Sequence, residues 1–496
     1  MEFDSELILA AEDFPDEEFR QNHTFSLYEN KIIRKLIAHG PVLIRGGRGS
    51  GKSALMKEAF FRTKDEENRE NIFGVYLSLR YLPLLRSEGK DYETFFCKLV
   101  IDKINQSFES DDYDFIPEPE IGSLQQELFN LSRKLKRRIV LFFDDAAHIG
   151  RETSLKEFFD IFRTLSSNTV SCKAAIYPGV TEFGSRFDLL NDASVIDIAR
   201  NEEAQSFGPF FKHIIEIRYS TKINYDSLKR ITIEEFSRFM GRAVTGNVRA
   251  FIFAMNHLLE ITEDDSIGIR EIDSTLKYLA TEYYWPLLEE LEPKLGRYEP
   301  LIEPTRELAE ILYKDVSESV DKPEYGPSFL IHRENIERLK KLFEIMEYVG
   351  FLVKRDSSRA MKNGGRGARY ILNLCNLIEV MPGNRLTHDL FDKWNSIEKE
   401  YTQIYRRGIL DKISLPPHDD ESESLGIITK PINVLKKSKA YPYGLTSHRI
   451  EKLEEAGYIT VGSVAEADNE DLLRINDIGD HWLQRIRSVV GQAIWM

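Results

Sequence analysis

The sequence predicts an α/β protein with a mainly parallel sheet, and three observations lead to this prediction. A short apolar strand, 42–45, runs through a glycine-rich loop into a helical pattern at 54–60. A second apolar run, 139–143, ends in two aspartates. Short apolar runs then alternate with helical patterns, as in a parallel sheet whose ligands bind at the carboxyl ends of the strands.

The remaining elements of this layer follow from the same periodicity. We expect strands at 73–79, 172–177 and 195–198, and helices at 92–108, 124–135 and 158–165. Together with the first two strands this makes five strands alternating with helices.

The glycine-rich loop is a complete phosphate-binding motif, formed by Gly46, Gly47, Arg48, Gly49, Ser50, Gly51, Lys52 and Ser53. Its glycines let backbone N–H groups surround phosphates, and the following helix N-terminus adds positive potential. Lys52 is expected to reach the β- and γ-phosphates, and the Ser53 hydroxyl to ligate Mg²⁺. The motif predicts ATP and Mg²⁺ as ligands.

The two aspartates at the end of the second strand are typical of a Walker B motif. We expect Asp144 to hold the Mg²⁺ shell and Asp145 to orient or deprotonate the attacking water. ATPases of this type usually have Glu at the second position, so the shorter Asp145 predicts slow hydrolysis. The alternative is that both acids cap the next helix.

After the fourth strand, Tyr177 and Thr181 are candidates for sensing the γ-phosphate, with an ordinary strand-to-loop turn as the alternative. The segment Thr245-Gly246-Asn247-Val248-Arg249 then opens a helix in a helical stretch beyond the sheet.

Composition narrows the class of protein. The chain has 496 residues, 42% of them hydrophobic, and a net charge of −15, so any nucleic-acid site must be local. No apolar run approaches the roughly 20 residues that cross a bilayer, and the N-terminus is acidic. The three cysteines, Cys97, Cys172 and Cys375, suggest neither disulfides nor zinc. We expect a cytoplasmic protein with no membrane contact.

The chain contains, in this order, a strand, a phosphate loop, paired aspartates and a helix that begins with Gly-Asn-x-Arg. This order resembles AAA+ ATPases of the origin-recognition and helicase-loader group, and the related signal-transduction ATPases with numerous domains. The resemblance covers about residues 20–280 and implies a helical lid and an oligomer. It implies that Arg249 contacts the γ-phosphate of its own subunit. It also implies an arginine finger acting on a neighbour, for which Arg186 is the candidate and Arg200 the alternative.

Beyond the lid, 334–346 has the spacing of an amphipathic helix, 348–353 reads as a strand, and 370–372 as its partner strand. This arrangement resembles a winged helix. Its loop carries six basic residues, which we expect to contact duplex DNA: Lys354, Arg355, Arg359, Lys362, Arg366 and Arg369. A solvated loop or docking on an acidic partner is the alternative.

The C-terminal region resembles tandem helix-hairpin-helix repeats, closest to the C-terminal domain of the bacterial RNA polymerase α subunit. Gly479 fits the phosphate-gripping turn, but Asp477 stands where a Gly is usual. The phosphate contacts it could offer are Lys452, Arg474, Arg485 and Arg487, and a module that binds a protein partner is the alternative.

The predicted organisation is an acidic tail (1–20), a P-loop core (21–205), a lid (206–280), a winged-helix-like domain (281–410), a linker (411–440) and a helix-hairpin-helix domain (441–496). We expect an ATP-hydrolysing switch that oligomerises and binds DNA through its winged helix, in replication, mobile-element or phage-defence biology. Two alternatives stay open: a signalling or scaffold ATPase without nucleic acid, and an assembly locked by nucleotide without hydrolysis.

Overall fold

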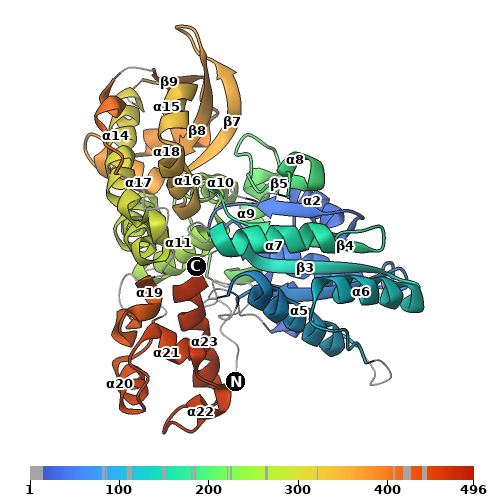
Figure 1. Cartoon of the computed structure of the whole chain (residues 1–496). Coiled ribbons are helices and arrows are strands. Elements are labelled where there is room, and N and C mark those ends of the chain that lie inside the picture. The colour runs from blue at the N-terminus through green and yellow to red at the C-terminus, as the bar shows by residue number, and fades with distance from the viewer. Residues whose placement is uncertain are drawn as a thin grey trace.

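The structure, a computed structural model, describes residues 15–495 except 81–83, 85–86, 109–113, 148–151, 180–182, 184–185, 221, 224–225, 263–265, 321, 406–407, 417–425 and 438–443. Residues 1–14 of the predicted acidic tail, and 417–425 and 438–440 of the predicted linker, therefore lie outside the described residues. Figure 1 shows an α/β layer beside a mostly helical middle part, with a small helical C-terminal part below them.

The α/β layer contains a five-stranded parallel sheet, as the sequence predicts. Its strands are β1 (Val42–Arg45), β2 (Ile72–Ser78), β3 (Arg138–Ala147), β4 (Val170–Ile176) and β5 (Ser194–Asp197). They lie in the order β2-β3-β4-β1-β5, and every neighbouring pair is parallel. The carboxyl ends of β1 and β3 therefore lie at the same edge, and the phosphate loop and the two aspartates lie there with them.

Helices cover both faces of this sheet. The helices α2 (Leu27–Ile37) and α3 (Lys52–Thr63) pack on one face, and α5 (Gly89–Gln106), α6 (Ile121–Leu135) and α7 (Glu152–Leu165) on the other. Side chains of β3 alternate between these cores: Val140 and Phe142 face α2 and α3, while Leu141 and Phe143 face α5 to α7. Burial on both faces explains the continuous apolar run in the sequence. The short helices α1 (Asp16–Asn22) and α8 (Leu189–Asp192) complete the layer.

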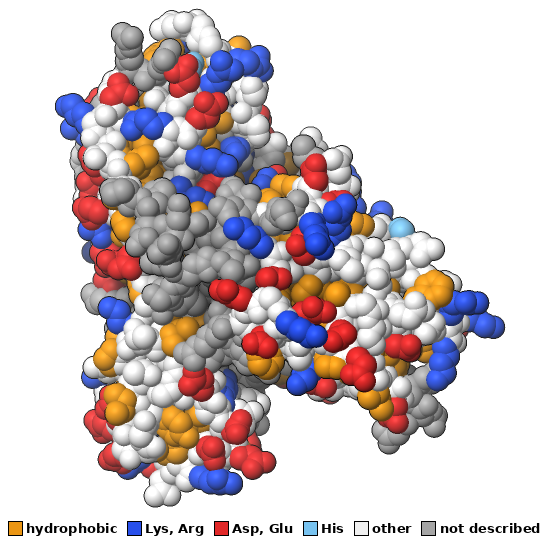
Figure 2. Space-filling model, in the orientation of Figure 1, with side chains coloured by type: hydrophobic (Ala, Val, Ile, Leu, Met, Phe, Trp, Pro, Cys, Tyr) orange, Lys and Arg blue, Asp and Glu red, His pale blue; other side chains and the backbone are white. Residues whose placement is uncertain are grey.

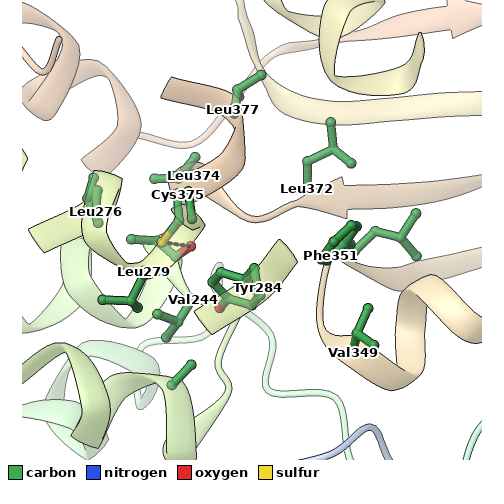
Figure 3. Packing of buried hydrophobic residues seen from close by; sticks show 14 of the residues in the cluster. Val244, Leu276, Leu279, Tyr284, Val349, Phe351, Leu372, Leu374, Cys375 and Leu377 are labelled. Carbon is green, nitrogen blue, oxygen red and sulfur yellow. Dashed lines mark hydrogen bonds between the residues drawn. The ribbon is translucent and has the colours of Figure 1, made fainter. Parts of the chain in front are cut away.

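The lid consists of α9 (Phe207–Arg218), α10 (Ile233–Ala243), α11 (Val248–Ile261) and α12 (Ile269–Leu279). The chain does not break at the predicted boundary of 280, because α12 continues through a π-helical turn, η3 (Ala280–Tyr284), into α13 (Trp285–Leu291). One hydrophobic core joins the lid to the third part, and Figure 3 shows Leu276 and Tyr284 packed near Leu374 and Phe351.

The third part combines helices with a small sheet in the order β7-β8-β6-β9. After the short turns η4 (Glu292–Lys294) and η5 (Gly296–Leu301), its elements are α14 (Ile302–Val320), β6 (Tyr325–His332), α15 (Arg333–Arg338), α16 (Lys340–Val349), β7 (Leu352–Ala360), β8 (Arg366–Leu372), α17 (Leu374–Val380), α18 (His388–Asn395) and β9 (Glu400–Ile404).

Two sequence predictions for this part are wrong. The single helix predicted over 334–346 is divided at Leu339, whose backbone is not helical and whose side chain is buried. The strand predicted from Tyr348 begins only at Leu352, because α16 continues to Val349 and ends at Gly350, which has a φ of 83°. Local periodicity did not reveal either change, because tertiary burial sets both.

The C-terminal part has a hydrophobic core of its own. Its elements are α19 (Gly426–Thr429), η7 (Ile432–Leu435), α20 (Ser447–Glu455), α21 (Val461–Glu466), α22 (Asn469–Leu473) and α23 (Asp480–Trp495). The turn η6 (Ile409–Lys412) packs on the larger core of the third part, whereas Ile427 and Ile432 already belong to the C-terminal core. Packed structure therefore extends into both ends of the predicted linker, 411–440.

Two further properties of the described residues bear on the sequence predictions. No helix among them has the length and apolar character that crossing a bilayer requires. The three cysteines are buried and unpaired, and burial raises the pKa of each thiol.

Candidate functional site

The phosphate loop has the backbone conformation that its glycines permit. Gly49 and Gly51 have φ values of 80° and 94°, in the left-handed region that favours glycine, and α3 begins at Lys52. The Lys52 Nζ donates to the carbonyl oxygens of Gly46 at 2.8 Å and Gly47 at 3.1 Å. It also lies 3.5 Å from the centroid of the Tyr177 ring. The lysine is therefore held inside the loop, at the position where a phosphate would meet the amides.

The two aspartates at the end of β3 have different surroundings. Asp144 is buried; its Oδ2 accepts a 2.5 Å hydrogen bond from the Tyr76 hydroxyl, and its Oδ1 accepts one from the backbone N–H of Asp145. Asp145 has a φ of 53°, which is uncommon for a residue other than glycine, and its Oδ2 lies 2.7 Å from the Arg80 Nε. Such backbone strain is typical of functional positions.

Arg80 is a site residue that the sequence analysis missed. It lies just beyond the carboxyl end of β2, which is next to β3 in the sheet, and it lines the same pocket as Lys52. A signal was available: a charged residue directly after a predicted strand falls at the ligand-binding edge. The ion pair with Asp145 links this arginine to the residue predicted to act on water.

One pocket collects the predicted phosphate-binding residues. Gly49, Gly51, Lys52 and Ser53 line it together with Arg249 from α11. The lid and the loop are also joined directly, because the backbone N–H groups of Val248 and Arg249 both donate to the Gly49 carbonyl, at 3.1 and 3.2 Å. A Cβ atom at Gly49 would lie 2.4 Å from the Asn247 Oδ1. The structure thus brings Arg249 next to the phosphate loop, as the resemblance implies.

The lining of this pocket also includes the segment Asn22–Phe25 and the apolar lid residues Phe210, Ile214 and Ile252. Nothing in the spacing of these residues in the sequence indicates that an N-terminal segment and two lid helices meet.

The arginine-finger candidates lie in different places. Arg200 is buried in the pocket of its own subunit, where its Nε pairs with Glu29 at 2.7 Å and its Nη1 donates to the carbonyls of Ser50 and Gly246. This position corrects the alternative assignment, because Arg200 holds the phosphate loop from within. Arg186 is exposed, so a trans role for it stays a prediction.

Of the two γ-phosphate sensor candidates, Tyr177 and Thr181, the structure describes only Tyr177. Tyr177 lines the pocket and is buried, and this burial, with Asp145 nearby, raises the pKa of its hydroxyl well above the usual value. Thr181 lies outside the described residues.

The third part of the chain also contacts the phosphate loop, which the sequence analysis did not predict. The backbone N–H of Arg48 donates to the Tyr348 carbonyl in α16 at 2.9 Å. The Arg48 side chain is buried beside Glu290 in α13, at 3.5 Å, and this carboxylate raises the pKa of the guanidinium although burial opposes its charge. A Cβ atom at Gly47 would lie 2.5 Å from the Glu347 carbonyl oxygen. The α16 helix therefore packs directly on the loop.

The six basic residues predicted to contact DNA separate into two groups. Arg355 is buried and its Nη2 lies 2.6 Å from a carboxylate oxygen of Glu202; Arg369 is buried beside Glu203 and Asp356. These two arginines join the third part to the segment just before α9, so their prediction as nucleic-acid contacts is wrong. A local charge count includes Asp356 but could not reveal Glu202 and Glu203, which lie roughly 150–170 residues earlier in the chain.

The other four basic residues remain on the surface of the β7–β8 hairpin. Lys354, Arg359, Lys362 and Arg366 are exposed. However, Arg359 pairs with Asp356 at 3.1 Å and Lys362 with Glu400 at 2.5 Å. Figure 2 shows basic side chains interspersed with acidic ones in the upper part of the view, where Figure 1 places β7 and β8. The hairpin is less positive than its own sequence suggests.

No family model and no curated protein matches this chain. It is similar to a Walker-type ATPase of Pyrococcus abyssi, with 14% identity, 71% of this chain and 93% of that chain covered, and a TM-score of 0.41.

Two initiator-type proteins are also similar. For Cdc6p of Pyrobaculum aerophilum the identity is 10%, the coverage 75% of this chain and 95% of that chain, and the TM-score 0.34. For the ORC2 protein of Aeropyrum pernix, in ADPNP–ADP complexes, the identity is 11%, the coverage 74% of this chain and 93% of that chain, and the TM-score 0.38. Likeness at this level assigns no family.

The chain has an α/β P-loop fold of the AAA+ class. This fold assignment rests on four features of the chain itself: the strand order β2-β3-β4-β1-β5, the phosphate loop after β1, the acidic end of β3 and the all-helical lid that contacts the loop.

Proposed function

We propose that this protein is an ATP-binding and ATP-hydrolysing switch. The observation that carries the proposal is the pocket in which the phosphate loop, Lys52, Arg80 and Arg249 meet. Three cationic side chains and a helix N-terminus favour a polyphosphate there, and the apolar side chains of Phe210, Ile214 and Ile252 in the same lining suit a nucleobase. ATP would supply the phosphoanhydride and Mg²⁺ would neutralise its charge, with Ser53 and Asp144 as the candidate ligands.

The residues of the chain have separate roles in this proposal. Lys52 exchanges its bonds to loop carbonyls for phosphate oxygens, and Arg249 couples the lid to the phosphates. Asp145 orients water, and its ion pair with Arg80 holds the carboxylate in place.

Single substitutions test the ATPase proposal directly. Lys52→Ala should abolish binding of a fluorescent ATP analogue, whereas Asp145→Ala should retain binding and lose about 100-fold in turnover. Lys57→Ala is a control for Lys52→Ala, because Lys57 also lies on α3 but does not line the pocket. Equal turnover by wild type and Asp145→Ala would remove Asp145 from the mechanism.

The proposed switch is an oligomer in which Arg186 completes the site of a neighbouring subunit. Mixing the Asp145→Ala and Arg186→Ala proteins tests this, because a mixed assembly would contain interfaces with both residues intact. Recovery of ATPase activity supports action in trans. Absence of recovery at every mixing ratio, with assembly confirmed, counts against Arg186.

Duplex DNA is the partner proposed for the β7–β8 hairpin. The element order α14-β6-α15-α16-β7-β8 supports a winged-helix assignment, with the hairpin as the wing. Replacing Arg359, Lys362 and Arg366 by Ala should reduce the slope of log affinity against log salt by up to about three units. Lys90→Ala on α5 is a control for removing an exposed cation elsewhere. An unchanged affinity and slope would exclude the hairpin.

A signalling or scaffold ATPase without nucleic acid is the second candidate, and one observation favours it. The α16 helix, the second helix of the α15–α16 pair, packs on the phosphate loop and is not available to a DNA groove in this arrangement. The C-terminal part fits a protein-binding module for a related reason. At its turn Asp477 has a φ of 69° and pairs with His448, and a carboxylate there opposes a phosphate contact. Absence of DNA binding at low salt with ATP would select this candidate.

A further inference from the structure

The edge of the five-stranded sheet that lies opposite the phosphate loop carries a concentration of positive charge. Between Glu127 in α6 and Asp144 in β3 the sequence has no acidic residue. It has five basic residues there, in the last turn of α6, in the connection to β3 and at the first position of β3: Arg133, Lys134, Lys136, Arg137 and Arg138. Because the strands are parallel, this connection lies at their amino ends, away from the nucleotide pocket.

A second group of cations comes from the end of α2. Arg34 and Lys35, in the last turn of this helix, are exposed. The Arg138 Nη2 donates to the carbonyl of Ile37, the last residue of α2, at 2.7 Å. This hydrogen bond joins the end of α2 to the start of β3, so both groups of cations border the same surface, the amino edge of the sheet.

The fold does not pair the exposed cations of the amino edge. Arg133 and Lys136 are exposed, and Arg137 is partly exposed. In the described part of the chain, no carboxylate forms an ion pair with any of these three side chains, nor with Arg34 or Lys35. Figure 2 shows basic side chains gathered at the right-hand end of the molecule, where Figure 1 places the end of α6. The amino edge therefore presents unneutralised positive charge to solvent.

Helix geometry accounts for part of this charge. A cation in the last turn of a helix stabilises the C-terminal end of the helix dipole, which explains Arg133 and Lys134 in α6. Lys136, however, is the cap residue, and Arg137 lies beyond the helix. Lys136 also has a φ of 54°, a conformation that favours glycine or asparagine. The charge at these two positions exceeds what the helix end requires.

Neighbouring residues limit this surface and respond to its charge. Three exposed acidic residues, Glu66, Glu67 and Glu70, precede β2 and border the amino edge on the β2 side. Inside the sheet, burial and then the nearby Arg138 lower the pKa of Lys173 to about 7. Like charges that are held together without carboxylates between them oppose folding. The amino edge thus gathers a charge that the fold itself does not need.

A phosphate backbone fits the amino edge better than an acidic protein does. Protein interfaces have an apolar centre that is depleted of charge. On α6 the exposed aromatic side chain is Phe129, and the Arg133 Cζ lies 5.6 Å from the centroid of its ring. Guanidinium groups pair with two phosphate oxygens at once, and lysines add point charges. Cations spread over two elements match the repeating charge of a duplex rather than a single small anion.

We propose that the amino edge of the sheet binds the phosphate backbone of duplex DNA, with Arg34, Lys35, Arg133, Lys136 and Arg137 as the contacts. The inference rests on the DNA-binding part of the proposed function and adds a contact separate from the β7–β8 hairpin. Backbone contacts carry no base specificity, so the amino edge raises affinity for all sequences alike. Its place opposite the phosphate loop leaves the nucleotide pocket open.

Duplex binding measured by fluorescence anisotropy over a range of salt concentrations tests this surface in the full chain. The edge variant combines Arg133→Gln, Lys136→Asn and Arg137→Gln, with Asn chosen because it tolerates the φ of residue 136. We expect the affinity to fall at least about 10-fold, and the slope of log affinity against log salt to decrease by up to about three units. The melting temperature should not fall, because mutual repulsion is removed.

A matched control removes three exposed cations from α5, from the α17–α18 connection and from the end of α19. It combines Lys98→Gln, Arg385→Gln and Lys430→Gln, so its net charge equals that of the edge variant. The control should bind duplex DNA with the affinity and salt slope of the wild type. An equal loss in both variants would show that net charge alone matters, and would overturn the proposal.

The hairpin substitutions Arg359→Ala, Lys362→Ala and Arg366→Ala separate this inference from the proposed function. Together they should leave measurable duplex binding, which the edge substitutions should then remove. If the hairpin substitutions abolish binding alone, or if the edge variant binds like the wild type, the inference is overturned and the hairpin proposal stands. If polyglutamate of equal charge binds the wild type as tightly as the duplex, the partner is an acidic protein and the inference is overturned. No duplex binding by the wild type at low salt overturns both DNA proposals and leaves ATP binding untouched.

Discussion

The contact between the phosphate loop and the third part depends on a buried carboxylate, and Glu290→Gln tests it. The Glu290 side chain is only 7% exposed and lies 3.5 Å from the Arg48 Nη1 and 2.6 Å from the Lys294 Nζ. Both cations are themselves buried, with side chains 11% and 4% exposed. The substitution leaves two buried positive charges without this carboxylate.

Breaking a buried pair by removing one partner costs about 3–5 kcal/mol. Because two cations depend on Glu290, we expect a loss toward the upper end of this range. For a unit of about 200 residues, each kcal/mol lowers the melting temperature by about 2–4 °C, so the midpoint should fall by roughly 10 °C or more.

The assay is thermal or urea unfolding of the full chain, with hydrogen exchange at α16 as a local probe of docking. Glu289→Gln is the matched control, because the neighbouring Glu289 is 63% exposed and pairs with Arg306 on the surface. Its effect should stay within about 0.5 kcal/mol. If Glu290→Gln is as mild as Glu289→Gln, then the buried pair does not hold the loop to the third part.

Three further predictions concern the sheet, the lid and the loop. Lys173 is fully buried on β4, and this burial, with Arg138 nearby, lowers the pKa of its ammonium to about 7. Between that pH and the unfolded value of about 10.5, the unfolded state binds more protons. Stability should therefore rise with pH there by up to about 1.4 kcal/mol per unit, and Lys173→Met should remove this slope in urea titrations. A Met variant with the wild-type slope would contradict the assignment. Asn247→Ala removes the cap of α11 and the bond from Nδ2 to the Arg48 carbonyl at 2.7 Å. We expect a loss of about 1–3 kcal/mol in unfolding experiments and weaker nucleotide binding, and a loss of stability alone would show that the cap does not shape the site. Gly49→Ala introduces a Cβ atom 2.4 Å from Asn247 at a φ of 80°, so nucleotide affinity measured by fluorescence should fall by at least about 10-fold. Equal affinity of this variant and the wild type would show that the loop adapts to the added methyl group.

The sequence by itself determined the local features of this protein. The loop from Gly46 to Ser53 and the run ending at Asp144 predicted the strand–loop–helix unit, the parallel sheet and the edge at which the site lies. These predictions succeeded because the spacing of glycines and the burial of a central strand on both faces are encoded within about ten consecutive residues. The Asn247–Arg249 helix start was visible for the same reason.

Only the tertiary structure decided which side chains far apart in the chain share an environment. In the sequence, Arg355 and Arg369 belong to a segment rich in basic residues. In the structure they form ion pairs with Glu202 and Glu203. Arg200 holds the phosphate loop of its own subunit. Arg80 pairs with Asp145. The physical reason is that an ion pair depends on separation in space, and neither periodicity nor local charge specifies which distant carboxylate a buried arginine will meet.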